Sequence, residues 1–165
     1  MTLRWPILEI TELTDAELAA LRIEPKRRLS QTRQKQKGSH YEQNYDLLAA
    51  ADDSRRYRLF VRQSSVHPQA FSVGLILLLP HSEDLIRCRY NGGSHTHANR
   101  LEDERLPAQP DVHVTTERYL RHGLYAEAYA TLTPEYHSVD GALHCLVTDC
   151  NVSGIPTTPD QPRLL

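Results

Sequence analysis

The sequence predicts an α+β fold, in which an antiparallel sheet of four to five strands packs against an N-terminal helix and one or two C-terminal helices. Three successive segments, 57–63, 71–79 and 85–90, have the residue pattern of strands and are joined by short connections. Short connections favour antiparallel neighbours, because parallel strands need a crossover of a dozen or more residues. A capping pattern near the N-terminus and an apolar stripe near the C-terminus indicate the helices.

The length and composition of the chain are those of a single domain. It has 165 residues, of which 39% are hydrophobic, and this is enough for one core of ordinary size. We expect residues 1–153 to form the domain and residues 154–165, which are rich in proline, to form a poorly packed C-terminal tail. The longest apolar run is far shorter than the roughly 18 residues that span a membrane, so no membrane contact is expected.

The cysteines favour a reducing, cytoplasmic location. Cys88, Cys145 and Cys150 are odd in number and include no C-x-x-C pair. This usage argues against a disulfide scaffold and against a zinc ribbon. The sequence does not indicate the oligomeric state.

The first predicted element is a short N-terminal helix. Thr14 and Glu17 stand three residues apart at the start of an apolar stripe, which is the pattern of a capping box. We expect this helix to run to about Ile23, because Pro25 cannot continue it. Residues 40–48 fit either a first strand or a further helix.

Residues 26–37 form a basic segment, although the formal net charge of the chain is −2. The segment contains six basic residues and no acidic one. Such a segment binds phosphates well, because each neutralised phosphate releases counterions. The alternative is a solvated helix face or a flexible arm. The candidate nucleic-acid-binding residues are Lys26, Arg27, Arg28, Arg33, Lys35 and Lys37.

The central strands are predicted to have one apolar and one basic face. Segment 71–79 is apolar on both faces and should lie in the middle of the sheet, whereas 57–63 and 85–90 alternate. If the apolar residues of the alternating segments face the core, four arginines share the opposite face: Arg58, Arg62, Arg87 and Arg89. This is either the ordinary wet side of a half-covered sheet or a phosphate-binding surface, since guanidinium groups fit phosphate well.

Helices and one weak strand are expected in the C-terminal part. Residues 116–122 fit a helix that Gly123 closes, and residues 125–131 alternate weakly as a strand would. Residues 140–150 have an apolar stripe at helical spacing and read as the final helix.

The residues most suited to chemistry are concentrated between positions 90 and 119. His95, His97 and Asn99 alternate with other residues after an Asn-Gly-Gly turn signal, and His113 and Thr115 alternate with valines. If both pieces are extended, each presents its polar set on one face. Such a cluster can ligate a metal, bind phosphate or transfer protons.

One interpretation of this cluster is a metal site. His95, His97 and His113 would supply three imidazoles to Zn or another divalent ion, and an open fourth position would carry an activated water. Asp111 or Glu117 could then orient a ligand or act as a base. The protein would be a divalent-metal-dependent hydrolase.

A second interpretation is cleavage of RNA without a metal cofactor. His113 would act as the base and His95 or His97 as the acid, since histidines exchange protons near neutral pH. Arg118 would hold the phosphate. The other candidates for contacts to substrate are Arg87, Arg89, Asn99, Thr115, Thr116 and Tyr119, with the two threonines at a helix start that attracts anions.

A third interpretation assigns the cluster no catalysis. Histidines near turns often bond only to the loop backbone, and Asn99 is a natural anchor for a loop. Clusters of His and Arg also bind anionic partners without reacting with them. In this case the protein would be a binding or regulatory module.

Several segments resemble an uncharacterised bacterial domain-of-unknown-function family. They include YRLFVRQSS, RYNGGSHTHANRLE, HVTTERY and GALHCLVTDCNV, and the similarity covers roughly residues 26–152. The resemblance implies a single bacterial domain whose signature includes His95, His97, His113 and Arg118. The size and basic character of the chain are also similar to those of toxin-like ribonucleases from toxin–antitoxin pairs. This analogy implies a protein partner for the chain in addition to RNA.

Overall fold

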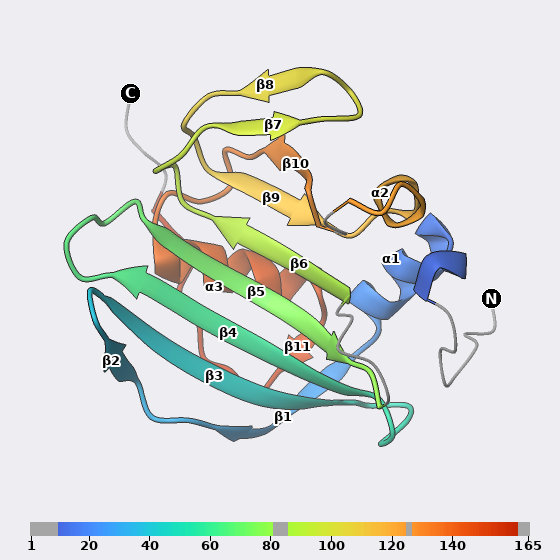
Figure 1. Ribbon diagram of the computed structural model, residues 1–165. Coiled ribbons are helices and arrows are strands. Elements are labelled where there is room, and N and C mark those ends of the chain that lie inside the picture. Colours follow the sequence, from blue (N-terminus) through green and yellow to red (C-terminus); the bar gives the residue numbers. More distant parts are fainter. Residues whose placement is uncertain (1–9, 81–85, 125–126, 162–165) are drawn as a thin grey trace.

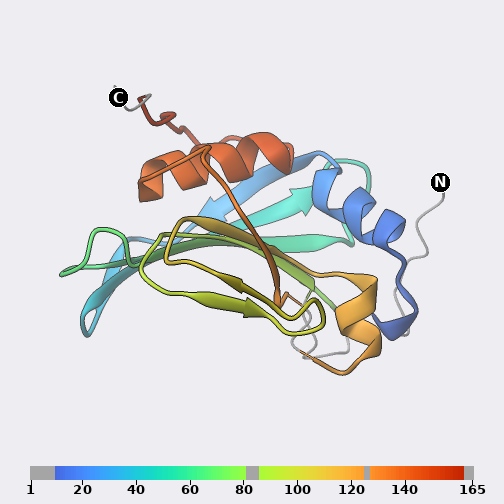
Figure 2. The same ribbon diagram turned by 90° about the horizontal axis from the view of Figure 1, so that it is seen from above.

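The structure is a computed structural model that describes residues 10–80, 86–124 and 127–161. One large sheet forms the centre of the molecule, with two helices on one of its faces (Figures 1 and 2). The strands are β1 (Lys26–Gln31), β2 (Lys35–Lys37), β3 (His40–Ala49), β4 (Arg56–Ser64), β5 (Phe71–Leu78), β6 (Ile86–Asn91), β7 (His97–Asn99), β8 (Glu104–Leu106), β9 (Asp111–Val114), β10 (Tyr129–Leu132) and β11 (Val152–Ser153). The helices are η1 (Ile10–Glu12), α1 (Asp15–Ile23), α2 (Glu117–Arg121) and α3 (Val139–Asp149).

The α+β class is confirmed, but the sheet has nine strands in the described part of the chain rather than four to five. The strand order is β10-β9-β6-β5-β4-β3-β1-β11, and β2 also pairs with β3. The predicted antiparallel meander is β4 to β6, and residues 40–48, which fitted either a strand or a helix, form β3 beside it. Among the described strands only the pair of β1 with β11 is parallel. The additional strands have two to six residues, too few for a clear alternating pattern, and long-range pairing stabilises them.

The basic segment is neither a helix face nor a flexible arm. It forms β1 and β2, which pair side by side with successive parts of β3. Lysine and arginine are poor strand formers, so the sequence does not indicate a strand here. They do suit an edge, where charged side chains discourage pairing with another chain.

The core lies between the sheet and the two helices α1 and α3 (Figure 2). Leu59 and Val73 of the central strands and Leu146 and Cys150 in and after α3 have no measurable exposure. The N-terminal helix begins as predicted, because Thr14 and the third helical residue form a capping box. None of the helices in the described residues is long and apolar enough to cross a membrane.

The predicted division of the sheet into an apolar and a basic face is confirmed for the described side chains. Phe60 points to the polar face together with the arginines, yet it is only 5% exposed. Its ring lies over Gly74 of the neighbouring strand, where an added Cβ would be 2.3 Å from the ring. A side chain in place of Gly74 would therefore force this ring out of position.

The C-terminal tail packs more closely than predicted, as far as residue 161. Ile155 is buried, and the carboxylate of Asp160 accepts hydrogen bonds from the backbone N–H groups of His137 and Ser138 at the start of α3. The hydroxyl of Ser138 also donates to Asp160. An acidic side chain is stabilising at a helix N-terminus, because unpaired N–H groups point towards it. Residues 162–165 of the predicted tail lie outside the described part of the chain.

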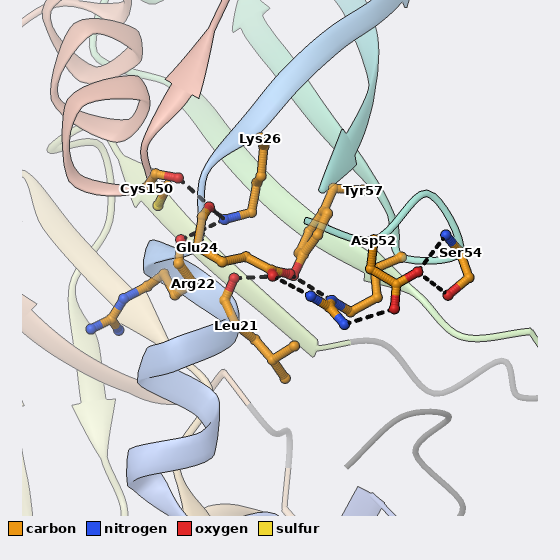
Figure 3. A network of polar contacts seen from close by, with 9 residues as sticks. Leu21, Arg22, Glu24, Lys26, Asp52, Ser54, Tyr57 and Cys150 are labelled. Carbon is orange, nitrogen blue, oxygen red and sulfur yellow. Dashed lines mark hydrogen bonds and ion pairs between the residues drawn. The ribbon is translucent and has the colours of Figure 1, made fainter. Parts of the chain in front are cut away.

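A network of polar contacts joins the end of α1 to the sheet and to the end of α3 (Figure 3). The amine of Lys26 is 1% exposed and donates hydrogen bonds to the carbonyl oxygens of Arg22, Glu24 and Cys150 at 2.7, 2.7 and 3.2 Å. Burial lowers the pKa of this amine to about 8. Lys26 therefore stabilises two helix ends and is not accessible for binding nucleic acid.

Candidate functional site

The candidate site is a groove on the polar face of the sheet, opposite the helices. Its volume is about 470 Å³, and it is open to solvent. The strands β3, β4, β5, β6 and β9 form its floor, and the chain before β7 forms one wall. The titratable side chains around it are His40, Arg62, Arg89, His95, His97, Asp111 and His113.

The register of the sheet places these side chains in two neighbouring rows. Arg62, Ser72, Asn91 and Asp111 lie opposite one another across four successive strands. In the next row, Arg89 of β6 lies directly opposite His113 of β9. Residues that are directly opposite share a face of the sheet, so the strand order gathers these polar groups above one surface.

His113 is held firmly in the floor of the groove and is 5% exposed. Its Nδ1 donates to the carbonyl oxygen of Glu127 at 3.0 Å, and its Nε2 lies 3.2 Å from Oδ1 of Asp111. The amide of Asn91 donates to the same Asp111 oxygen at 3.3 Å, and Ser72 donates to Asn91 at 2.8 Å. A chain of polar contacts therefore runs from Ser72 to His113 and fixes the imidazole in place.

His97 packs against His113 and has a defined proton arrangement. The two ring centroids are 4.6 Å apart, with the rings close to perpendicular. Nε2 of His97 lies 2.7 Å from the carbonyl oxygen of Ala128 and 3.1 Å from Oδ1 of Asn99. Because a carbonyl oxygen can only accept, Nε2 carries the proton in this contact. Nδ1 of His97 is then the nitrogen whose lone pair can accept a proton.

Asn99 has a structural position rather than a place in the groove. It is 1% exposed, and its side-chain amide exchanges two hydrogen bonds of 2.9 Å with the backbone of Ala130 in β10. These contacts attach the β7–β8 hairpin to the edge of the sheet (Figure 1). Asn99 thereby holds the strand that carries His97.

Arg89 is a cation with spare hydrogen-bonding capacity. Its nearest acidic group is the carboxylate of Glu127, with Nε and Oε1 3.7 Å apart, beyond hydrogen-bond range. The Nε atom is buried and has no hydrogen-bond partner among the described residues. Because Nε is enclosed, an anion in the groove would meet the rest of this side chain, which is 34% exposed.

Arg62 is more exposed and only loosely paired. Its guanidinium lies 3.8 Å from the carboxylate of Glu42 and 5.0 Å from the centre of the Phe60 ring. Glu42 also pairs with Lys37 at 3.0 Å, and this hydrogen bond, with Arg62 nearby, lowers the pKa of the carboxyl group. Arg62 is therefore free to turn towards an anion without breaking a strong contact.

Arg118, the predicted phosphate clamp, lies away from the groove. Its guanidinium is exposed and bonds to the carboxylate of Glu102 at 3.0 Å and to the carbonyl oxygen of Leu101 at 3.1 Å. Tyr119 is 1% exposed and donates to the same carboxylate at 2.6 Å. The sequence does not indicate this contact, because Glu102 is brought next to Arg118 only by the path of the loop between β7 and β8.

The predicted anion seat at Thr115 and Thr116 is not part of the groove either. Thr115 is buried, and the hydroxyl of Thr116 caps α2 by accepting from the N–H of Tyr119. The helix has only five residues, so its dipole is weak. Arg87 of β6 pairs with Ile76 along the backbone, but its side chain lies outside the described part of the structure.

The remaining candidates of the basic segment lie on the exposed edge of the sheet. Arg27, Arg28, Arg33, Lys35 and Lys37 are exposed, in contrast to Lys26. Lys37 is paired in register with His40, which lines the groove. The end of the segment therefore reaches the groove, whereas its start at β1 lies beyond β3.

A three-histidine metal site is not assembled in this arrangement. No group of three or more His, Cys, Asp or Glu side chains in residues 10–80, 86–124 and 127–161 is placed to hold a metal ion. Both ring nitrogens of His113 and one of His97 already face other partners. His95 lines the groove and is exposed, so a metal would need these contacts to rearrange.

Sequence reasoning missed several groups that shape the groove. Ser72 appeared only as part of a buried strand, Asn91 only as a turn residue, and Glu127 not at all. The alternation of Asp111 with His113 was the one available signal, since residues two apart in a strand share a face. The other contacts depend on which strands become neighbours.

Comparisons with known proteins add no relative. No protein family model matches the chain, and no curated protein or solved structure matches it. The resemblance to an uncharacterised bacterial family therefore stays a prediction. The function has to be argued from the groove itself.

Proposed function

We propose that the groove binds a phosphate-bearing ligand, with RNA as the first candidate. The observation that carries this proposal is that Arg62 and Arg89 line the same groove as His95 and His97. Guanidinium groups bind phosphate oxygens with two parallel hydrogen bonds, and the side chain of Arg89 is 34% exposed where it lines the groove. Hydroxyl groups on the same walls, including that of Ser94, can donate to further oxygens.

The acidic groups near the groove do not oppose this proposal. Asp111 is 4% exposed and faces His113 and Asn91, so little of its charge reaches the solvent. Glu42 is held by Lys37 and Arg62. An incoming phosphate would therefore meet cations and neutral donors first.

Cleavage of the bound RNA is the second candidate function, and the state of His97 favours it. With Nε2 donating to the Ala128 carbonyl, Nδ1 can remove the proton of a ribose 2′-hydroxyl. The 2′-oxygen would attack the phosphorus, the bond to the 5′-oxygen would break, and His95 would protonate the leaving oxygen. The products are a 2′,3′-cyclic phosphate and a 5′-hydroxyl end.

These roles differ from those expected from the sequence. His113, predicted as the base, has both nitrogens engaged and is better suited to position His97 through their ring contact. Arg89 takes the place of Arg118 as the residue that holds the phosphate. The zinc-dependent hydrolase and the non-catalytic module remain as alternatives that the experiments below separate.

Binding can be tested by fluorescence anisotropy with a labelled single-stranded RNA over a range of salt concentrations. Arg89→Gln should weaken binding and reduce the slope of log K against log salt by about 0.7, the value for one phosphate contact to a single strand. Arg118→Gln is the matched control, because that arginine is exposed and paired outside the groove. Equal effects of the two substitutions, or no binding by the wild type, would contradict the proposal.

Cleavage can be tested with the same RNA by following cyclic-phosphate ends. His97→Ala should reduce the rate by roughly 10² to 10⁴, as for the loss of an acid–base group. His122→Ala is the control, since His122 is exposed at the end of α2. Binding without any cleavage would favour the non-catalytic module. Cleavage that disappears with a chelator and returns with Zn would favour the metal-dependent hydrolase.

A further inference from the structure

A row of arginines leads out of the groove along β4. Arg56, Arg58 and Arg62 are exposed on the polar face of this strand, and the buried Phe60 takes the position between the last two. Arg62 lines the groove, so the row begins at the site itself. We call Arg56, Arg58 and Arg62, together with Arg89 of β6, the arginine track.

The surface between the arginines of β4 and β6 is formed by β5 and is uncharged. Ser72, Gly74 and Ile76 of β5 lie between the two basic strands in register. The Phe60 ring lies over Gly74 and is almost fully buried, and Ser72 and Ile76 on either side are half-buried, so this surface carries no charge. Two strand spacings separate β4 from β6, about 10 Å.

The cations of the track are held only weakly by acidic neighbours. Arg58 pairs with Asp46 at 3.1 Å, but the two side chains are 45% and 41% exposed. Exposed pairs of this kind contribute about 0–1 kcal/mol, so a phosphate can displace the carboxylate at little cost. Arg56 has no ion pair among the described residues. The track therefore has cations to offer to a second anion beyond the groove.

We propose that the ligand of the groove is a single-stranded RNA that continues along β4, with phosphates along the strand bound by Arg62, Arg58 and Arg56. This inference rests on the proposed function of the groove. Arg56 and Arg58, two residues apart, are separated by about 6.8 Å, within reach of successive phosphates of an extended single strand. Arg58 and Arg62, four residues apart, are separated by about 14 Å, so one further phosphate would lie between them, over Phe60. The ligand is therefore a polymer that extends well beyond the groove, and not a single nucleotide.

The chemistry of the track favours RNA over an acidic peptide. Its four cations are all arginines, whose planar forks match phosphate oxygens. A peptide that adds to a sheet uses the free backbone groups of an edge strand. Here β4 is paired on both sides, with β3 and β5, so its backbone is not available.

The inference can be tested by comparing a dinucleotide with an octanucleotide of 2′-fluoro RNA, which lacks the nucleophilic hydroxyl. Arg56→Gln/Arg58→Gln should leave dinucleotide binding unchanged. For the octanucleotide it should reduce the slope of log K against log salt by about 1.4, or about sevenfold over a fourfold change in salt. Arg105→Gln/Arg121→Gln is the matched control, because both arginines are exposed and lie on β8 and α2.

The possible results separate this inference from the function of the groove. Suppose that the dinucleotide binds, but that the slope of log K against log salt for the octanucleotide is the same in wild type and Arg56→Gln/Arg58→Gln. The inference about the arginine track is then overturned, and the proposal for the groove stands. If neither oligonucleotide binds the wild type, both proposals are wrong. If poly-aspartate of equal charge displaces the octanucleotide as well as unlabelled RNA does, the track binds acidic peptides and the inference is overturned.

Discussion

The ion pair between Arg55 and Glu24 allows the sharpest test of how this fold is stabilised. Two hydrogen bonds of 2.7 and 3.0 Å join the guanidinium to the carboxylate, and the side chains are 9% and 10% exposed. Tyr57 donates to the same carboxylate, and Glu24 is the residue that ends α1. The pair therefore attaches the end of the helix to the start of β4.

Glu24→Gln keeps the size of this side chain and removes its charge. Loss of one partner from a buried pair costs about 3–5 kcal/mol, because the other charge stays buried without compensation. Asp52 still contacts Arg55 at 3.0 Å and is 35% exposed, so the low end, about 3 kcal/mol, is expected. The total free energy of unfolding of a domain of this kind is about 5–15 kcal/mol, so the loss would be a large fraction of it.

Urea denaturation followed by circular dichroism measures this loss as a lower midpoint with an unchanged slope. Asp46→Asn is the control, since it breaks an exposed Arg–carboxylate pair and should cost about 0.2–1 kcal/mol. Glu24→Gln/Arg55→Met should recover much of the stability by removing the stranded charge. A loss for Glu24→Gln no larger than that of the control would show that solvent already screens this pair, and the reasoning would be refuted.

Three further predictions concern single positions. The pKa of Lys26 is about 8 in the folded protein and 10.5 in the unfolded chain. Between these pH values the unfolded state binds more protons, so the stability should rise with pH. In urea titrations, the unfolding free energy of the wild type relative to Lys26→Met should therefore grow by up to about 3 kcal/mol between pH 8 and pH 10.5. Gly74→Ala should cost about 1–3 kcal/mol by displacing the Phe60 ring, and Phe60→Leu in the same chain should recover part of this loss. Asp160→Asn should lower the unfolding free energy by about 1–2 kcal/mol in thermal or urea unfolding, because its hydrogen bonds to the start of α3 are weaker. Burial raises the pKa of Asp160, but these hydrogen bonds lower it overall. The difference in stability between wild type and variant should therefore disappear as acid protonates the carboxylate.

The parts of the fold that the sequence predicted are those encoded by nearby residues. The capping box at Thr14, the helix that begins after Ser138 and the meander from β4 to β6 all follow from patterns within about ten residues. In each case the local preference and the final packing agree, as expected for a sequence without conflicting signals.

Most of the outer strands could not be predicted, because distant partners decide them, and β10 was indicated only by the weak alternation of residues 125–131. Residues 26–37 have the composition of a solvated segment, and they become strands only because β3 presents a long paired edge. The short strands β9 and β10 have four residues each and pair with one another. Four residues carry almost no periodic signal.

The candidate site shows the same limit at the level of side chains. His113 was predicted to lie with His95 or His97, and the structure places the rings of His97 and His113 in contact. Arg118 was included because it is near in sequence, but a short helix carries it away towards Glu102. Arg89 and Arg62 line the groove instead, and they come from strands earlier in the chain, β6 and β4.

The alternation that builds the core also builds the groove, and this couples stability to function. In β6, Cys88 and Tyr90 face the helices while Arg89 and Asn91 face the groove. A shift of one residue in this strand would bury a guanidinium and expose an apolar side chain, so any register error is strongly unfavourable. At Gly92 the backbone packs closely against residue 69, since a Cβ there would lie 2.1 Å from the carbonyl oxygen of Gln69. This close packing of two backbone segments fixes the register. Gly92→Ala should therefore disturb Arg89 and Asn91 in the groove as well as the fold, and binding and stability should decline together.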